Sequence, residues 1–352
     1  MSGHCTHKIL FVLPSLLGIG GACRSARRLT VALREQGHEV WVLFPDHDLF
    51  PGVRHQEDFS WSFHLEGGMQ AFSTEVVRAI DHIKPDFLVG WYGSIGGVAA
   101  VSAAKLRSLP VVVALRGNDI DLDFFLPERH GLISWVISNA TAITTVSTEM
   151  KHKVQSWFGR EATFISNSVN REIFFKDVEA TEVFRARYIS SSKPVLGLFG
   201  EFKPKRGLEL LSRIYDEIEH WQPLIVGKIR DNVAHLIPPH AIKVPYLRDD
   251  AQLRGAYGVC DVVIQPSLYD GMPNVVLEAL ACKKIVLSSA AGGLSDLSSQ
   301  DENAFICHTS SEWKALLQKV RARDLEERPV CLPTPEEEAQ AYRRIFDQIK
   351  SS

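Results

Sequence analysis

Short runs of apolar and β-branched residues alternate with helical patterns along the chain, and this alternation constrains the fold more than any other feature of the sequence. The run at residues 8–13 is followed by a glycine-rich turn, a helical pattern at 22–36 and a second run at 39–44. This order is that of a βαβ unit. Gly37 follows the helical pattern, at the position where the end of a helix favours glycine. The pattern predicts a parallel sheet covered by helices.

The alternation occurs in two series separated by a charged, weakly apolar stretch at 176–193. Two series agree with about two domains for a chain of 352 residues. We therefore expect an α/β protein whose first domain spans residues 1–175 and whose second spans 176–332, with residues 333–352 forming a final helix that returns to the first domain. The remaining strands of the first series are expected at 87–91, 111–115, 142–147 and 163–166. Those of the second series are expected at 195–199, 224–226, 242–244, 262–265 and 285–288.

Composition excludes several classes of protein. Lysine and arginine total 39 against 42 aspartate and glutamate, so no global positive field selects nucleic acid. The six cysteines form no C-x-x-C pair and no zinc spacing with histidine, which predicts reduced thiols in a cytoplasmic protein without a metal centre. Uncharged stretches at 87–104 and 131–148 are interrupted by glycine or polar residues, so we expect buried strands and helices there and no membrane span. Residues 1–10 lack the pattern of a signal peptide.

The most informative stretch is QPSLYDGMPNVVLEALAC at 265–282, where a predicted strand ends in a turn and Pro273 opens an apolar helix. An ionised Glu278 inside that helix is costly unless something polar meets it. Asp270 in the turn and Glu278 can face one ligand placed over the N-terminus of the helix, where N–H groups favour phosphate and carboxylates accept bonds from sugar hydroxyls. A nucleotide sugar has both parts. The alternative is that Glu278 pairs with a lysine or arginine and Asp270 only shapes the turn.

This stretch resembles the retaining glycosyltransferases of the group 1 family (family 4, GT-B fold), which carry two acids separated by seven residues in the pattern E-G-F-P-N, a hydrophobic run and E-A-M-A. Weaker family motifs follow in the expected order over nearly the whole chain. They are Gly20, Gly21, Ala22 and Arg24; residues 165–170; DVVIQPS at 261–267; and residues 291–294 with Asp296. The resemblance implies two Rossmann-like parallel-sheet domains facing a central cleft. It implies transfer of a sugar from a UDP- or GDP-sugar to an acceptor hydroxyl without metal or other cofactor, in glycan, polysaccharide or glycolipid synthesis.

The resemblance also assigns the two acids. Glu278, the second acid, would hold the nucleotide ribose, and Asp270, where the family usually has glutamate, would orient the transferred sugar. The other residues that we expect to bind the donor are Gly20, Gly21, Tyr246, Gly271, Met272, Pro273, Asn274 and Val275.

A cluster of cations follows the first predicted strand of the second series, in GEFKPKRG at 200–207. Lys203, Lys205 and Arg206 would stand where a leaving diphosphate can be neutralised, unless the cluster is only a solvated group of charges. The family turn usually reads G-R-x-x-x-x-K-G, so Glu201 replaces its arginine and Arg206 its lysine. We predict that Arg206 binds the diphosphate, that Lys203 compensates for the missing arginine, and that Glu201 has no assigned role.

In the first domain Arg116, Gly117, Asn118 and Asp119 follow the strand expected at 111–115. Parallel sheets bind ligands at the carboxyl ends of their strands, so we expect Arg116, Asn118 and Asp119 on the acceptor or phosphate side of the site. Many family members have histidine where Arg116 stands. An arginine cannot act as a base at neutral pH, which favours a role in binding an anion. The alternative is a salt bridge from Arg116 to Asp119 or Asp121 that braces the loop.

Two other functions stay open. Glu201 and Asp270 depart from the family pattern, which would suit a noncatalytic protein that binds nucleotide sugars. Gly18, Gly20 and Gly21 with Asp46 form part of a dinucleotide fingerprint, which would suit an NAD-dependent oxidoreductase. The expected partners are a nucleotide sugar donor and a carbohydrate or lipid-linked acceptor, with peripheral membrane association left open.

Overall fold

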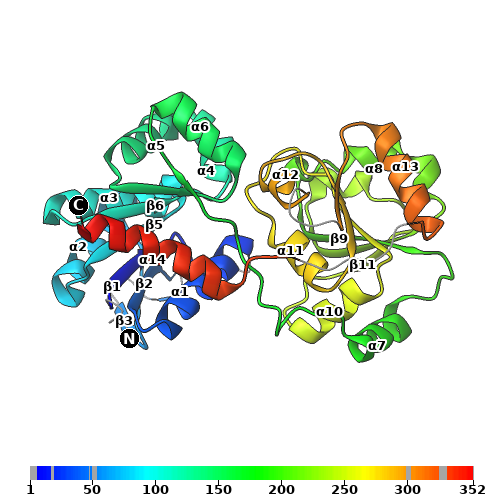
Figure 1. Cartoon of the computed structure of the whole chain (residues 1–352), viewed down its shortest axis with the longest axis horizontal. Coiled ribbons are helices and arrows are strands. Elements are labelled where there is room, and N and C mark those ends of the chain that lie inside the picture. Colours follow the sequence, from blue (N-terminus) through cyan, green and yellow to red (C-terminus); the bar gives the residue numbers. More distant parts are fainter. Residues whose placement is uncertain are drawn as a thin grey trace. The chain divides into compact units, whose positions relative to one another are not determined.

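The computed structural model describes residues 6–16, 20–46, 48–49, 54–298, 303–324 and 331–351. The chain divides into two compact units (Figure 1). The first contains Met1–Asn167 together with Pro335–Ser352, and the second contains Ser168–Thr334.

The first unit is built on an eight-stranded sheet in the order β3-β4-β2-β1-β5-β6-β7-β8. Neighbouring strands are parallel except β3 and β4, which are antiparallel at one edge. Runs such as KILFV in β1 are buried almost throughout, as expected of parallel strands covered on both faces. The strands are β1 (Lys8–Val12), β2 (Glu39–Pro45), β3 (Arg54–Glu57), β4 (Ser60–Phe63), β5 (Phe87–Trp91), β6 (Val111–Ala114), β7 (Ala142–Thr145) and β8 (Thr163–Phe164).

Amphipathic helices cover this sheet. Helix α1 (Gly21–Glu35) buries the stripe of Ala26, Leu29 and Leu33 and ends before Gly37, whose φ of 89° lies in the left-handed region. The other helices are α2 (Gly68–Ile83), α3 (Gly97–Arg107), α4 (Asn118–Asp121), α5 (Pro127–Asn139) and α6 (Thr148–Phe158). A π-helical turn, Tyr92–Gly96, connects β5 to α3, and a short 3-10 turn, Asp123–Phe125, precedes α5.

The last helix of the chain, α14 (Pro335–Ser351), belongs to the first unit. Its apolar face places Tyr342, Ile345 and Phe346 in the same buried cluster as residues of β1, β2 and β5. Figure 1 shows this helix, in red, lying across the first unit beside α1. Acidic residues occupy its first turn and Lys350 its last, an arrangement that complements the helix dipole.

The second unit has a six-stranded sheet in the order β11-β10-β9-β12-β13-β14, with every neighbouring pair parallel. Its core includes Trp221, Leu287 and Trp313. The strands are β9 (Val195–Phe202), β10 (Gln222–Ile229), β11 (Ile242–Val244), β12 (Val262–Gln265), β13 (Ile285–Ser288) and β14 (Ala304–Ile306). The helices are α7 (Val178–Tyr188), α8 (Glu209–Arg213), α9 (Tyr215–Ile218), α10 (Asp250–Gly258), α11 (Asn274–Ala281), α12 (Gly293–Ser298) and α13 (Ser310–Arg321).

The predicted α/β class is confirmed, because both units are Rossmann-like parallel sheets with helices on their faces. Three strands were not predicted: β3, β4 and β14 are short edge or near-edge strands with little β-branched sequence. The stretch at 176–193, expected only to separate the two series, contains α7. Among the described residues, no helix combines the length and the apolarity that crossing a bilayer requires.

Candidate functional site

Three loops meet at the carboxyl edge of the second sheet. They follow the adjacent strands β9, β12 and β13, and they carry Lys203–Gly207, the segment 266–273 and the turn at 291–293. The backbone N–H of Leu268 donates to the carbonyl of Lys205 at 2.9 Å, and the N–H of Gly293 donates to the carbonyl of Gly271 at 2.6 Å. The loop after β12 is therefore held by backbone hydrogen bonds on both sides, at the edge where parallel sheets bind ligands.

Two glycines make this close packing of loops feasible. Gly207 (φ 63°) and Gly292 (φ 54°) adopt left-handed backbone conformations. A Cβ at Gly207 would collide with the carbonyl oxygen of Pro266, and one at Gly292 would collide with the carbonyl oxygen of Asp270. Any other residue at these positions would separate the loops.

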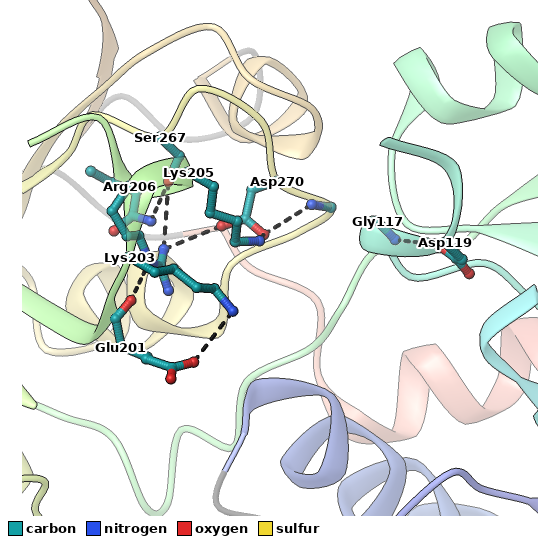
Figure 2. Close-up of polar contacts among 10 residues, drawn as sticks. Gly117, Asp119, Glu201, Lys203, Lys205, Arg206, Ser267 and Asp270 are labelled. Atoms are coloured by element: carbon teal, nitrogen blue, oxygen red, sulfur yellow. Dashed lines mark hydrogen bonds and ion pairs between the residues drawn. The ribbon is translucent and has the colours of Figure 1, made fainter. Parts of the chain in front are cut away.

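Asp270 lies between two cations of the loop after β9. Its Oδ1 is 3.3 Å from Nζ of Lys205, and its Oδ2 is 3.2 Å from Nη1 of Arg206 (Figure 2). The three side chains are only 11 to 15% exposed. Burial lowers the pKa of Lys205, and Asp270 acts against that shift. Arg206 also donates to the carbonyl of Glu201 at 3.2 Å, so its guanidinium is oriented by the loop as well as by the acid.

Lys203 belongs to a different ion-pair cluster. Its Nζ lies 3.3 Å from Oε2 of Glu201, and Arg230 at the end of β10 donates to Oε1 of the same carboxylate from Nε at 2.7 Å. Burial favours the neutral acid, but these two cations hold the pKa of Glu201 below its ordinary value. The side chains of Lys203 and Glu201 are each about one third exposed, at 36 and 35%. Glu201, left without a role by sequence reasoning, thus organises Lys203 and Arg230.

Glu278 is buried in α11, where every residue except Val275 is buried. Its Oε2 accepts a hydrogen bond of 2.9 Å from the hydroxyl of Tyr257 on α10. The ring of Tyr257 stacks on Phe199 of β9, with ring centroids 4.2 Å apart. One polar group that meets Glu278 is therefore a neutral hydroxyl held by a packed aromatic ring.

The other residues expected to bind a donor occupy the same sheet edge or the start of α1. Met272 and Asn274 are buried, Gly271 precedes them, and Pro273 is the N-cap of α11. Tyr246 is half-buried after the edge strand β11. In the first unit Gly20 caps α1, and Gly21 begins it; both are exposed. Gly18 lies outside the described residues.

In the first unit Arg116 and Asp119 are both buried after β6, and their contacts differ from the salt bridge given above as the alternative. The guanidinium of Arg116 lies over the ring of Trp91, 4.1 Å from its centroid, and donates to the side chain of Asn167. Asp119 is fully buried and accepts the backbone N–H group of Gly93 at 2.9 Å. It also accepts that of Gly117 at 2.8 Å (Figure 2). Asn118 is half-buried beside them.

Asp119 is thus the anchor of this turn. It also accepts the N–H groups of Arg116 and Ile120. Burial raises the pKa of Asp119, while the hydrogen bonds from Gly93, Arg116 and Gly117 favour its ionised form. Two acids that follow it in the sequence make ion pairs, Asp121 with Lys153 and Asp123 with Arg129. Within the described residues no group of three or more metal-ligating side chains was found.

Sequence reasoning missed Tyr257 and did not single out Lys205. Tyr257 is five residues from the nearest predicted strand, and no local pattern links it to Glu278. Lys205 was named only as one of three cations, yet it is the lysine that contacts Asp270. The burial of Lys205 depends on the backbone contact between its loop and Leu268, which is remote in the sequence.

Known family models match both units of the chain. The family model described as Glycosyltransferase Family 4 matches residues 19–173, and the model described as Glycosyl transferases group 1 matches residues 193–322. A GDP-mannose-dependent alpha-mannosyltransferase of Mycolicibacterium smegmatis is 24% identical over 334 residues, covering 82% of this chain and 81% of that protein.

An uncharacterized glycosyltransferase of Methanocaldococcus jannaschii is 24% identical over 208 residues, covering 57% of this chain. The match covers 55% of that protein, so the chain spans about half the length of this relative. Among solved structures, the Anabaena protein HepE in complex with UDP-glucose superimposes with a TM-score of 0.72 at 18% identity, covering 98% of both chains. At this identity the likeness establishes the GT-B fold.

Proposed function

Since family models match both units, the chain belongs to the group 1 glycosyltransferases, and we propose that it transfers a sugar from a UDP- or GDP-sugar to an acceptor hydroxyl with retention of the anomeric configuration. The observation that carries the proposal is Asp270 beside Lys205 and Arg206, immediately before the N-terminus of α11. Cations and helix N–H groups suit a diphosphate, and a carboxylate beside them can accept hydrogen bonds from sugar hydroxyls.

The proposed roles follow the chemistry of the bond that breaks. Departure of a nucleoside diphosphate leaves positive charge on the sugar and negative charge on the diphosphate, so preorganised cations stabilise the transition state. Arg206 and the backbone N–H groups at the start of α11 would bind the diphosphate. Asp270 would orient the transferred sugar, and Glu278 would accept hydrogen bonds from the ribose. No protein nucleophile or metal is required in this scheme.

Relatives support the donor class. One is named as GDP-mannose-dependent and a structural neighbour binds UDP-glucose, so both bases belong in the proposal. The acceptor would be a carbohydrate or a lipid-linked saccharide, placed by the first unit through Arg116 and Asn118. The five described cysteines are free thiols, which supports a cytoplasmic enzyme of glycan, polysaccharide or glycolipid synthesis.

The second candidate is a noncatalytic protein that binds nucleotide sugars. The observation that favours it is the use of Glu201 to hold Lys203 and Arg230, where the family usually presents an arginine to the diphosphate. Slow hydrolysis of a donor sugar without acceptor would establish an enzyme. Saturable binding without turnover on any acceptor would establish the binding protein.

A panel of nucleotides tests the proposal directly. Thermal unfolding would be followed with UDP, GDP, UDP-glucose, GDP-mannose and NADH. A ligand at 100 times its dissociation constant adds about 2.7 kcal/mol to the free energy of unfolding, which is readily measured. Stabilisation by at least one UDP or GDP compound is expected. Stabilisation by NADH alone would replace the proposal with an oxidoreductase.

A further inference from the structure

Two lysines of the loop after β9 compete for a role at the diphosphate, and their surroundings distinguish them. The side chain of Lys205 is 11% exposed and contacts Asp270, which Arg206 contacts from the other side. Lys203 is 36% exposed and contacts Glu201, a carboxylate already paired with Arg230. Each lysine thus has a carboxylate partner, but only Lys205 shares its partner with Arg206 (Figure 2).

The cluster of Lys205, Arg206 and Asp270 contains two positive charges and one negative charge. Because all three side chains are largely removed from solvent, their charges are screened less than those of a surface pair. An anion that carries more charge than one carboxylate would therefore be favoured on these two cations. Oxygens of a diphosphate satisfy both charge and hydrogen-bond geometry at an arginine and a lysine.

Only side chains would need to move for such an exchange. The backbone of Lys205 is fixed by its carbonyl, which accepts from Leu268 N–H, and the turn that follows ends at Gly207 against Pro266. The carboxylate of Asp270 is also bonded to the N–H of Gly271 at 3.1 Å, so it keeps a donor when the cations leave it.

We propose that Lys205, together with Arg206, binds the donor diphosphate, and that Asp270 is the counter-ion of both cations until the diphosphate replaces it. This inference rests on the proposed function, because the anion is the diphosphate of a nucleotide sugar. Replacement frees Asp270 to accept hydrogen bonds from the sugar. In the ligand-free chain, the carboxylate of Asp270 is therefore the anion of the site. Lys205 takes over the role of the arginine that the family has at the position of Glu201.

The test measures binding of inorganic pyrophosphate, UDP and GDP to the full chain by calorimetry at low ionic strength. Lys205→Met is expected to weaken binding of pyrophosphate and of the preferred nucleotide by about tenfold or more, the loss of one charge-assisted contact. Lys205→Arg should stay within about threefold of the unmodified chain. Lys319→Met, which removes an exposed lysine of α13, controls for the loss of one positive charge.

Asp270→Asn provides a second measurement that does not depend on the lysine variants. Removing the internal counter-ion should tighten pyrophosphate binding several-fold. Unchanged pyrophosphate binding in both Lys205→Met and Asp270→Asn, or a larger loss in Lys203→Met than in Lys205→Met, would overturn the inference.

Failure of the proposed function gives a different result. Pyrophosphate binding that depends on Lys205, without binding of any nucleotide or nucleotide sugar, would remove the proposed function and leave the anion site. Nucleotide binding that is unaffected by Lys205→Met would leave the proposed function and remove the inference. Thermal unfolding of each variant without ligand confirms that it is folded.

Discussion

The hydroxyl of Tyr257 donates a hydrogen bond of 2.9 Å to Oε2 of Glu278, and this contact joins α10 to α11 inside the second unit. A phenol donates one hydrogen bond to the acid and brings no positive charge, whereas a lysine or arginine at that position would bring one. Under the proposed function, Glu278 held in this way would accept hydrogen bonds from the ribose hydroxyls.

Glu278→Gln is expected to weaken binding of the preferred nucleotide sugar by about tenfold or more, because the loss removes a charge-assisted acceptor of ribose hydroxyls. The amide has the size of the acid, and its oxygen can still accept from Tyr257, so the thermal unfolding temperature should change little. Calorimetry and turnover measure the first effect. Tyr257→Phe, which keeps the carboxylate, is the control and should have the smaller effect on binding. Unaltered turnover in Glu278→Gln would remove this acid from the site.

Gly207→Ala is expected to reduce both stability and nucleotide binding. The alanine Cβ would meet the carbonyl of Pro266 at a left-handed backbone position, so the loop that carries Lys205 and Arg206 must move away from the loop after β12. Gly131→Ala in α5 is the matched control, because its Cβ would enter open space within a helix. Chemical unfolding and calorimetry check the pair. Equal free energies of unfolding and equal nucleotide affinities of the two variants would contradict the prediction.

Glu75 should make stability depend on pH. It accepts from Arg54 at 2.5 Å, Trp61 at 3.0 Å and Arg78 at 3.1 Å, and although burial opposes ionisation, these donors hold the pKa of Glu75 below 4.5. A depressed folded-state pKa adds stability above the unfolded-state value, and that stability is lost as pH falls through the folded-state value. Glu75→Gln should therefore cost about 1–3 kcal/mol at pH 7 and less near pH 3.

Urea unfolding at the two pH values tests this dependence. Glu66→Gln is the control, since the side chain of Glu66 is 65% exposed. A cost for Glu75→Gln that is the same at both pH values would show that packing, not the charge of Glu75, explains the loss.

Asp119→Asn is expected to destabilise the first unit by about 2–4 kcal/mol. The amide nitrogen would face backbone N–H donors of Gly93, Arg116 or Gly117, leaving buried groups without an acceptor. Asp123→Asn, which affects a partly exposed ion pair with Arg129, should change stability by less than about 1 kcal/mol. Denaturant unfolding followed by circular dichroism compares the two. A smaller cost for Asp119→Asn than for Asp123→Asn would contradict the anchoring role.

The sequence predicted the α/β class because burial and β-branched composition coincide in strands such as β5 and β12, whose bounds match the predicted runs. It did not predict β3, whose residues Arg54–Glu57 form a strand only by pairing with β4. Local pattern does not contain such pairing, since the contact supplies the stabilisation.

The same distinction applies to the site. Glu278 could be singled out because its helix is apolar, a feature readable within eight residues. The choice between Lys203 and Lys205 could not be made in the same way. Both lie in one short turn, and what separates them is contact with Asp270, 65 residues from Lys205 in the sequence. For Asp119, the spacing indicated a ligand contact or a salt bridge. In the structure its carboxylate accepts the backbone N–H of Gly93, in the turn between β5 and α3, and that of Gly117 in its own turn.

Helix α14 has a consequence for synthesis of the chain. Ala339, Tyr342, Ile345 and Phe346 complete a core whose other buried members occur before residue 168, so the first unit is assembled from two segments separated by the whole second unit. A nascent chain can fold the second unit while the core of the first unit still lacks the side chains of α14. The unit whose synthesis begins first can then finish folding only after α14, which follows the whole second unit, has been made.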